Sequence, residues 1–526
     1  MAVIYEIKER RVIPNWRDYK RTLQLGELNV ANKKYKPIDI SIDRAIFDWQ
    51  LNKDIGTAAD VINSSFVADK FNQSEVREAI DYIKKNENKS SKSLLGIINE
   101  IENSGRILTS SNSILELDVD TIKEFQAFIN NDTFHRVINK TKNLAKKDLY
   151  NPITWIELGR LYSMRGHIAK AEKAILTALQ LAPNNRFVLR SATRFFIHEE
   201  KFDKAIYYLR KSNNIKNDPW LISAHIATSS IMGRFSPYIK YGKSIIESND
   251  FSDFELTELL SSLGTLEYKN GTFKKAKALF EKSMISPNDN SLAQLEWISK
   301  DDNRFEIDPF KYDKVINPFE ARALELFERG NWQDAFYNSI KWFLDMPFSK
   351  RPALLGSYIA GSLIKDKNAA IILCEVGLQA NPHDPTLLNN IVYSIATSTE
   401  IDKVLLEKYV KRLIEIDIHT LPDESKITYQ ATLGLVYLKK GNLELGKSLY
   451  KIAIENAKRI NNDYLKNLAI FNFTRELITL DLPEKHEYIS MVEKIKISND
   501  KKDLQVLKKD IEELIRMQPN KSVKRK

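Results

Sequence analysis

Residues 152–185 read PITWIELGRLYSMRGHIAKAEKAILTALQLAPNN, and this stretch decides the fold. Its apolar residues follow helical spacing on both sides of Gly166, and Pro183 stops the second helical stretch. Gly159 and Ala171 are small enough to let two antiparallel helices approach each other closely. The stretch therefore predicts a helical hairpin.

The bend of this hairpin recurs along the chain. Each copy has a helix-breaking residue, an apolar residue two positions later and a small residue three positions beyond that. The copies lie at 166–171, 271–276, 330–335 and 441–446, with a variant at 200–205. A repeated hairpin predicts an all-α chain, and it favours an array that holds partners over a pocket that turns over a substrate.

The stretch 152–185 resembles the tetratricopeptide repeat (TPR). That repeat places Trp, Leu, Gly and Tyr on its first helix and small residues on its second, with a closing proline and a period of 34 residues. Trp155, Leu158, Gly159 and Tyr162 match the first-helix positions. The resemblance implies an all-α, TPR-like superhelical solenoid of antiparallel helix pairs, with one concave and one convex surface. Similar units lie at 186–219, 257–290, 316–349, 351–384 and 427–460, and weaker pairs at 220–250, 385–420 and 464–497.

The repeat pattern divides the chain into parts. Residues 299–315 are polar, contain a proline and lack helical period, so we expect a connector between two arrays there. Before the arrays, 56–85 predicts a helical pair that turns near 69–71, and 12–16 is expected to be extended. The predicted parts are an N-terminal region (1–117), a first TPR-like array (118–298), the connector (299–315), a second array (316–497) and a C-terminal helix with a basic tail (498–526).

Composition limits the class of protein. The 526 residues contain only 17 Gly and 16 Pro, few for a strand-and-turn protein, and the net charge is a mild +10. The one cysteine, Cys374, excludes an internal disulfide and a cysteine-based metal cage. The sequence has no run of about eighteen apolar residues, so we expect a cytoplasmic protein without a membrane partner.

Motifs that carry catalysis are missing from the sequence. The seven histidines are scattered, and none pairs with a second metal ligand at helical spacing. The sequence contains neither a glycine-rich phosphate loop that ends in Lys-Ser or Lys-Thr nor a Gly-x-Ser-x-Gly turn. We therefore expect no enzyme activity, no cofactor and no metal.

In the repeat that the chain resembles, the first helix of each pair lines the concave surface. At those positions, units 152–185 and 186–219 carry arginines beside apolar residues. Arginine forks bind carboxylate or phosphate, so this patch predicts a partner protein or peptide with an acidic segment. The alternative is that the arginines pair with acids of the chain itself, such as Glu157 or Glu199. The predicted partner-binding residues are Ile156, Arg160, Phe187, Arg190 and Arg194.

These observations favour a non-enzymatic scaffold, adaptor or sensor subunit of a multi-protein system. The Lys-, Asn- and Ile-rich usage is typical of AT-rich genomes, which suggests a bacterial source. Free-standing bacterial proteins that look like this are often regulatory subunits, and by this analogy we expect a system that resists phage. The oligomeric state stays open.

A nucleic-acid-associated regulatory protein is the alternative. Basic and aromatic side chains interleave near the N-terminus, a composition compatible with nucleic-acid contact and also with an ordinary solvated cap. These residues are Lys8, Arg10, Arg11, Arg17, Lys20 and Arg21, with Tyr5, Trp16 and Tyr19 among them.

Overall fold

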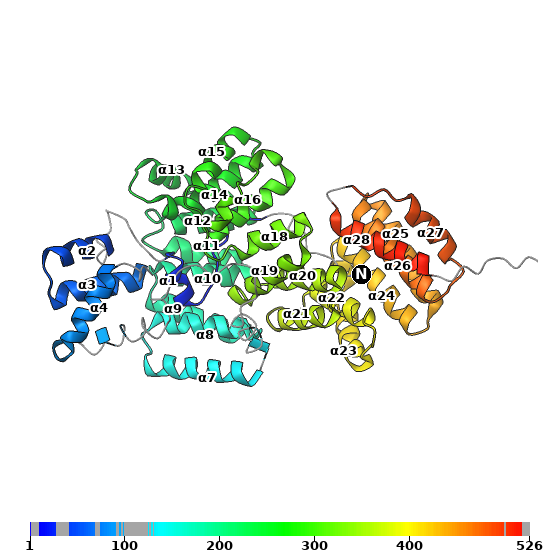
Figure 1. Cartoon of the computed structure of the whole chain (residues 1–526), viewed down its shortest axis with the longest axis horizontal. Helices are drawn as coiled ribbons and strands as arrows, with labels where there is room; N and C mark the ends of the chain where they lie inside the picture. The colour runs from blue at the N-terminus through cyan, green and yellow to red at the C-terminus, as the bar shows by residue number, and fades with distance from the viewer. Residues whose placement is uncertain are drawn as a thin grey trace, which may run out of the picture.

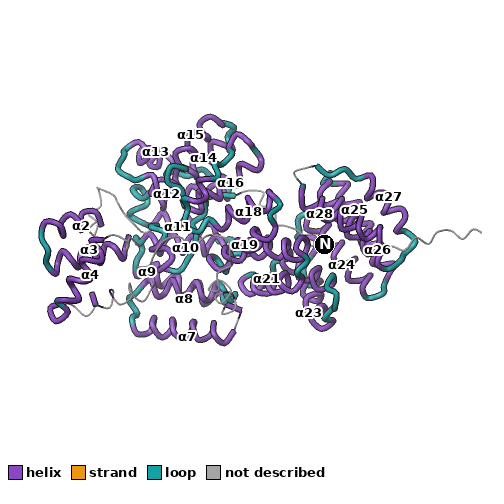
Figure 2. The backbone as a smooth tube through the Cα atoms, in the orientation of Figure 1, coloured by secondary structure: helices purple, strands orange, loops and turns teal. Residues whose placement is uncertain are grey.

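All regular secondary structure in the described part of the chain is helical. The structure, a computed structural model, describes residues 1, 10–27, 42–68, 74–90, 94–95, 98, 125, 128–129, 131–498 and 501–517. Among these residues Figure 2 shows helices and connecting loops, without any strand. The predicted all-α, TPR-like fold is confirmed.

The first array is a succession of antiparallel helix pairs, in which most helices pack against their neighbours along the chain (Figure 1). Its helices are α7 (Asn131–Lys147), α8 (Pro152–Ser163), α9 (Ile168–Leu181), α10 (Arg186–His198), α11 (Phe202–Lys211), α12 (Pro219–Ile231), α13 (Ile239–Glu247), α14 (Asp253–Lys269), α15 (Phe273–Ser283) and α16 (Asp289–Asp301).

The second array continues the same stacking toward the C-terminal end. Its helices are α18 (Phe319–Arg329), α19 (Trp332–Asp345), α20 (Lys350–Tyr358) with the π-helical turn η3 (Ile359–Ile364), α21 (Lys367–Ala380), α22 (Pro385–Ala396), α23 (Lys403–Ile414), α24 (Asp423–Lys439), α25 (Leu443–Arg459), α26 (Asp463–Thr479), α27 (Lys485–Lys494) and α28 (Lys502–Met517). α25 is the second helix of unit 427–460.

Several first helices begin in the same way. Asn151, Asp218 and Asp384 each precede a proline, and their side chains accept hydrogen bonds from backbone N–H groups of the first turn of α8, α12 and α22. Proline suits this position because its missing N–H would have no helical partner there. These caps fix where the helices that line the concave surface start.

Small residues bring the paired helices together. A Cβ atom on Gly159 would lie 2.9 Å from Ile175 Cγ1 and 3.4 Å from the carbonyl oxygen of Ala171. A Cβ atom on Gly434 would lie 2.9 Å from the ring of Tyr450. Larger side chains would force these helices apart, so the predicted close approach at Gly159 and Ala171 is confirmed.

The predicted connector is largely folded into the array. α16 extends through Asp301, the short helix α17 (Phe310–Asp313) follows, and α16 packs on α18. Phe305, Tyr312 and Val315 are buried in one core cluster with residues of α15 and α16. Apolar anchors at irregular spacing, rather than helical period, hold this stretch in place.

The N-terminal region contains a small helical unit with a core of its own. It consists of α2 (Ile42–Leu51), α3 (Ile55–Ala68) and α4 (Ser74–Lys85), packed around Trp49. The last two are the helical pair that the sequence predicts at 56–85, whereas its predicted turn lies outside the described residues. The C-terminal basic tail also lies outside them.

The superhelix closes on itself after one turn. The bend between α8 and α9 contacts α21, where Arg165 Nη1 donates to Gln379 Oε1 although the two residues are 214 positions apart. Gly166 has a φ of +67°, and a Cβ atom there would lie only 2.7 Å from the Gln379 carbonyl oxygen. Phe128 also packs against Phe343 of α19, with ring centroids 5.2 Å apart. The two ends of the turn that runs from α8 to α21 are therefore in contact with each other. Among the described residues, none of the helices is long and apolar enough to cross a membrane.

Candidate protein-binding groove

The concave surface of this closed turn is occupied by the chain's own residues 10–27, which we call the N-terminal segment. The segment has no regular structure from residue 10 to 18 and then forms the short helix α1 (Tyr19–Gln24). Its residues contact the first helices of several pairs, namely α8, α10, α12, α16 and α18. Figure 1 shows α1 beside α10, although more than a hundred residues separate the two in sequence.

Arg10 binds a fork of acceptors on α16 and α18. Its Nε and Nη2 donate to the two carboxylate oxygens of Glu320 at 2.9 and 3.1 Å. Its Nη1 donates to Gln294 Oε1 at 3.1 Å, and Nη2 also donates to Asn290 Oδ1 at 3.1 Å. Burial alone would raise the pKa of Glu320, but Arg10 and Arg351 outweigh it and hold that pKa at about 2. Glu320 is therefore a charged, fully paired anchor for Arg10 at neutral pH.

Arg17 lies among three buried carboxylates and is only 1% exposed. Its Nε donates to the Asp345 oxygens at 2.8 and 2.7 Å, its Nη1 donates to Glu27 Oε1 at 3.1 Å, and its Nη2 donates to Asp289. One guanidinium cannot offset the desolvation and mutual repulsion of three acids. Burial accordingly raises the pKa of Asp289 to about 6 and that of Glu27 to about 7, although Arg17 lowers both.

Two aromatic side chains, Trp16 and Tyr19, also anchor the segment. Trp16 packs against Phe195 of α10 and against Phe348 after α19, with ring centroids 6.1 and 5.3 Å apart. Tyr19 meets Phe187 of α10 edge-on at 5.2 Å. Such aromatic pairs each contribute roughly 0.5–1.5 kcal/mol beyond the area that they bury. Trp16 Nε1 has no hydrogen-bond partner among the described residues, so the pocket accepts the ring and not the indole N–H.

Amide side chains of α16 hold the main chain of the segment. Gln294 Nε2 donates to the carbonyl oxygen of Arg10 at 3.1 Å, and Asn290 Nδ2 donates to that of Ile13 at 2.8 Å. Every residue carries a backbone carbonyl, so these contacts favour a non-helical peptide without selecting its side chains.

The beginning of the chain reaches the second array. Met1 is buried there, and Asn389 Nδ2 of α22 donates to its carbonyl oxygen at 2.7 Å. In Figure 1 the mark for this end lies among α22 and α24. Here again an amide side chain of the array donates a hydrogen bond to a main-chain carbonyl oxygen.

The structure places the predicted arginines in this groove and pairs two of them with acids of the chain. Arg160 Nε donates to Glu157 Oε2 at 3.3 Å, which is one of the pairings that the sequence left open. Arg190 donates to both carboxylate oxygens of Glu258 at 2.7 and 3.1 Å and lies 3.6 Å from Glu27. Glu258 on α14, rather than Glu199, is the acid that Arg190 binds.

The remaining predicted residues also lie beneath the N-terminal segment or in the core. Ile156 is fully buried, and Phe187 is covered by an aromatic ring of the segment. Arg194 stacks over Phe348 at 5.4 Å, and its Nε lacks a hydrogen-bond partner among the described residues. Burial and the nearby Arg351 lower the pKa of Arg194 to about 10.

Most of the basic and aromatic N-terminal side chains that could have contacted nucleic acid face the groove rather than solvent. The segment therefore does not present them as a free basic arm. Arg10, Arg11, Trp16 and Arg17 are buried, Tyr19 and Arg21 are half-buried, Lys20 is exposed, and Tyr5 and Lys8 lie outside the described residues.

The acids that line the groove were missed from sequence, although a signal for two of them exists. Arg190 and Phe187 hold the fifth and second positions of unit 186–219, positions that line the concave surface. The same positions carry Glu320 in unit 316–349 and Glu258 in unit 257–290. Applying the rule to every unit would have predicted a groove of mixed charge.

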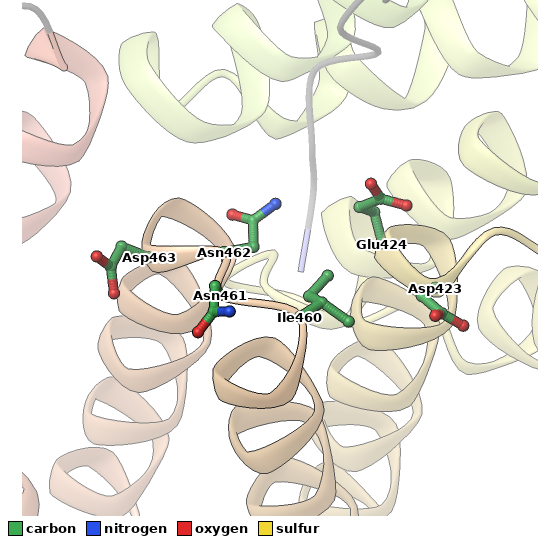
Figure 3. A pocket seen from close by; sticks show the side chains of 6 residues that line it. All are labelled: Asp423, Glu424, Ile460, Asn461, Asn462 and Asp463. Atoms are coloured by element: carbon green, nitrogen blue, oxygen red, sulfur yellow. The ribbon is translucent and has the colours of Figure 1, made fainter.

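A separate polar hollow lies on the second array, between the start of α24 and the loop from α25 to α26 (Figure 3). Asp423 pairs with Lys426 at 3.1 Å, and Asp463 pairs with Lys466, so both aspartates are balanced within their own helices. The hollow has a volume of about 410 Å³ and is lined by Asp423, Glu424, Ile460, Asn461, Asn462 and Asp463.

Comparisons with known proteins give only distant likenesses. No protein-family model matches the chain, and a search of curated proteins found no match. Among solved structures, yeast Tom70 is 13% identical with a TM-score of 0.28, over 77% of this chain and 98% of its own. A chain of the APC/C hetero-tetramer Cut9–Hcn1 is 12% identical with a TM-score of 0.38, over 89% and 92%. A monomeric IFIT1 mutant with m7Gppp-AAAA is 13% identical with a TM-score of 0.29, over 80% and 94%.

Likenesses at this level carry no argument about function. The class of the protein follows from its own helix pairs, which form a TPR-like solenoid. What distinguishes this solenoid is a concave groove that holds a segment of the same chain through buried arginine and tryptophan side chains.

Proposed function

We propose that this protein is a non-enzymatic scaffold that binds a peptide segment of a partner protein in the groove. The N-terminal segment occupies the groove when the partner is absent. The observation that carries this proposal is the complete burial of Arg17 and Trp16 in a site formed by helices far away in sequence. Such a site recognises a peptide through side-chain pockets and main-chain hydrogen bonds together.

The bound segment behaves as a ligand rather than as part of a helix pair. It has little regular structure of its own, and side chains of the groove take up hydrogen bonds of its main chain. Its attachment to the chain raises its local concentration, so a partner must compete with a tethered occupant. Occupancy of the groove would then control when the scaffold is available.

The wider role in this proposal is that of an adaptor or sensor subunit in a cytoplasmic, multi-protein system of bacteria. Defence against phage is the context that the analogy in fold supports. The nucleic-acid alternative has less support, because its predicted contacts Arg10, Arg11 and Arg17 are buried under groove side chains.

A cross-linked chain tests the proposal. Tyr19 N donates to Glu157 Oε1 at 2.9 Å and both residues are half-buried, so a short bismaleimide can join cysteines placed at these two positions in the full chain. The native Cys374 is buried, and burial raises its thiol pKa to about 12, so it will not compete for the reagent.

Proteins recovered from the native host with the wild-type chain define the partners. We expect the Tyr19→Cys, Glu157→Cys chain to lose them after cross-linking and to recover at least part of them without the reagent. Recovery of the same proteins in the same amounts after complete cross-linking would contradict binding in the groove.

A further inference from the structure

We infer that the partner segment is basic and aromatic: a large aromatic residue followed directly by an arginine, with a second arginine six residues before the aromatic one. This inference rests on the proposed function and names the chemistry that the groove selects. It follows from the pockets that Arg10, Trp16 and Arg17 fill, and it differs from the acidic partner that the arginines alone predict.

The charge of the groove favours a cationic occupant. The cationic partners of Asp289 and of Asp345 within the described residues are arginines of the N-terminal segment, Arg17 and Arg21. A neutral or acidic occupant would leave both carboxylates buried without a cation, which is strongly unfavourable. An arginine at the place of Arg17 satisfies both at once, because its planar fork can donate in two directions.

An acidic occupant would gain little in exchange. Arg190 already donates to both oxygens of Glu258, and Arg160 donates to Glu157. A carboxylate of the partner would have to displace Glu258 and leave that acid buried and unpaired. The predicted arginine patch therefore lacks a free charge at these two positions.

The aromatic pocket next to the acids fixes the order of the motif. Trp16 contacts Phe195 and Phe348 and precedes Arg17 directly, so a partner must present its ring and its guanidinium on adjacent residues. The unpaired Trp16 Nε1 shows that ring size, not the indole N–H, is selected. Phenylalanine or tyrosine could also enter, with less buried area.

The spacing along the main chain sets the position of the second arginine in the motif. Arg10 reaches Glu320, Asn290 and Gln294. Gln294 Nε2 donates to the carbonyl oxygen of Arg10 itself, and Asn290 Nδ2 donates to that of Ile13, between Arg10 and Trp16. These backbone contacts fix the spacing and leave the intervening side chains free to vary.

With the N-terminal segment bound, some buried hydrogen-bond donors of the groove and the segment still lack an acceptor. Arg194 Nε and Trp16 Nε1 are buried donors without an acceptor in the described part of the chain, and each lost hydrogen bond weakens the bound state. A partner that supplies an acceptor beside Phe348 would bind better than the segment does. This difference gives a partner a physical basis for displacing the tethered occupant.

Peptide binding to the full chain tests the inference. The probe is a fluorescein-labelled peptide with the sequence of residues 10–27, and the receptors are the full-length Arg17→Ala variant and the Trp16→Ala, Arg17→Ala variant. Both variants weaken the internal segment and leave the groove itself unchanged. Circular dichroism and thermal unfolding confirm that each receptor is folded.

We expect fluorescence anisotropy to show binding of the probe, weakened at least tenfold by Arg17→Glu in the peptide. Shifting the first arginine by two positions should have a similar effect, and so should Asp289→Asn with Asp345→Asn in the receptor. Equal affinity for an acidic peptide of the same length would overturn the inference and leave the scaffold proposal standing. Absence of binding by every peptide to a folded receptor would instead overturn the proposed function, because the segment would then be a permanent part of the core.

The wild-type chain gives an independent test, because this test does not require a variant with a weakened N-terminal segment. A peptide with benzophenone in place of the Trp16 ring, added in excess, should cross-link to the chain near Phe195 or Phe348. Mass spectrometry of the digested product locates the label. Labelling confined to other surfaces would contradict the inference.

Discussion

Arg17 donates from Nε to both carboxylate oxygens of Asp345, at 2.8 and 2.7 Å, across 328 positions of sequence. Both side chains are almost completely shielded from solvent, at 1% and 2% exposure. A buried ion pair of this kind owes its importance to the cost of breaking it, because the partner left behind keeps an unpaired buried charge. The pair therefore ties the N-terminal segment to the end of α19.

Replacing Arg17 by alanine should release the segment. We expect docking of residues 10–27 to weaken by about 3–5 kcal/mol, the usual cost of removing one member of a buried pair. Hydrogen exchange with mass spectrometry should show lost protection in the segment and in α10, whereas α26 keeps its protection because contacts in a solenoid are local. The matched control is Arg234→Ala, which breaks an exposed pair with Asp203 and should change little. Unchanged protection of the segment in Arg17→Ala would contradict this prediction.

Docking of the segment should depend on pH through Glu27. Burial raises its pKa to about 7, above the value of about 4.3 in an unfolded chain. Because the folded pKa is raised, this carboxyl contributes fully to stability below about pH 4, and the contribution is lost as the pH rises through about 7. We expect exchange protection of residues 10–27, corrected for intrinsic rates, to fall between pH 6 and pH 8.

Glu27→Gln isolates this contribution, since the amide stays neutral over the whole range. Asp289 titrates in the same direction with a pKa of about 6, so part of the fall should remain in the variant. Identical pH profiles for the wild-type chain and Glu27→Gln would show that Glu27 does not control docking.

Arg190 and Glu258 should behave as one unit. We expect Arg190→Leu and Glu258→Leu each to cost about 3–5 kcal/mol in the free energy of unfolding, because each leaves a buried charge alone. The double variant should cost less than the sum of the two. Urea unfolding followed by circular dichroism measures this cycle, and the exposed pair Arg322 and Asp313 serves as the control cycle with small coupling. Simple additivity at Arg190 and Glu258 would contradict the assignment.

Gly159→Leu should destabilise unit 152–185 by roughly 1–3 kcal/mol, because the new side chain meets Ile175 on the facing helix. Exchange protection should fall in α8 and α9 and persist in α24 and α25. Ala169→Leu adds the same side chain on the exposed side of α9 and should have a much smaller effect. Equal loss of protection in α8 and α25 would mean that the whole array unfolds together.

The helix pairs could be predicted from sequence because their determinants are local. Glycines and alanines at fixed spacing, and capping residues before proline, act within one unit, so Gly159 and Asn151 define their hairpin wherever the chain goes next. The concave positions followed from the same spacing, and Phe187, Arg190 and Arg194 indeed lie in the groove.

The occupant of the groove could not be predicted in this way. Arg10 meets Glu320, and Arg17 meets Asp345, only after the superhelix has turned through many units, and no local spacing encodes that approach. The alternation of arginine with Trp16 and Tyr19 was visible, but it suits an exposed basic surface as well as a buried ligand. Long-range packing decides between the two.

Because the superhelical turn is closed, the affinity of the groove for an occupant and the rate at which that occupant is exchanged can vary independently. A segment inside this ring can leave sideways only when the α8–α9 bend parts from α21, at the contact of Gly166 with Gln379. Exchange by this sideways route would then be limited by how often the ring opens. While its ring stays closed, each molecule would keep the segment that was bound when the ring last closed, whichever segments are then present in solution.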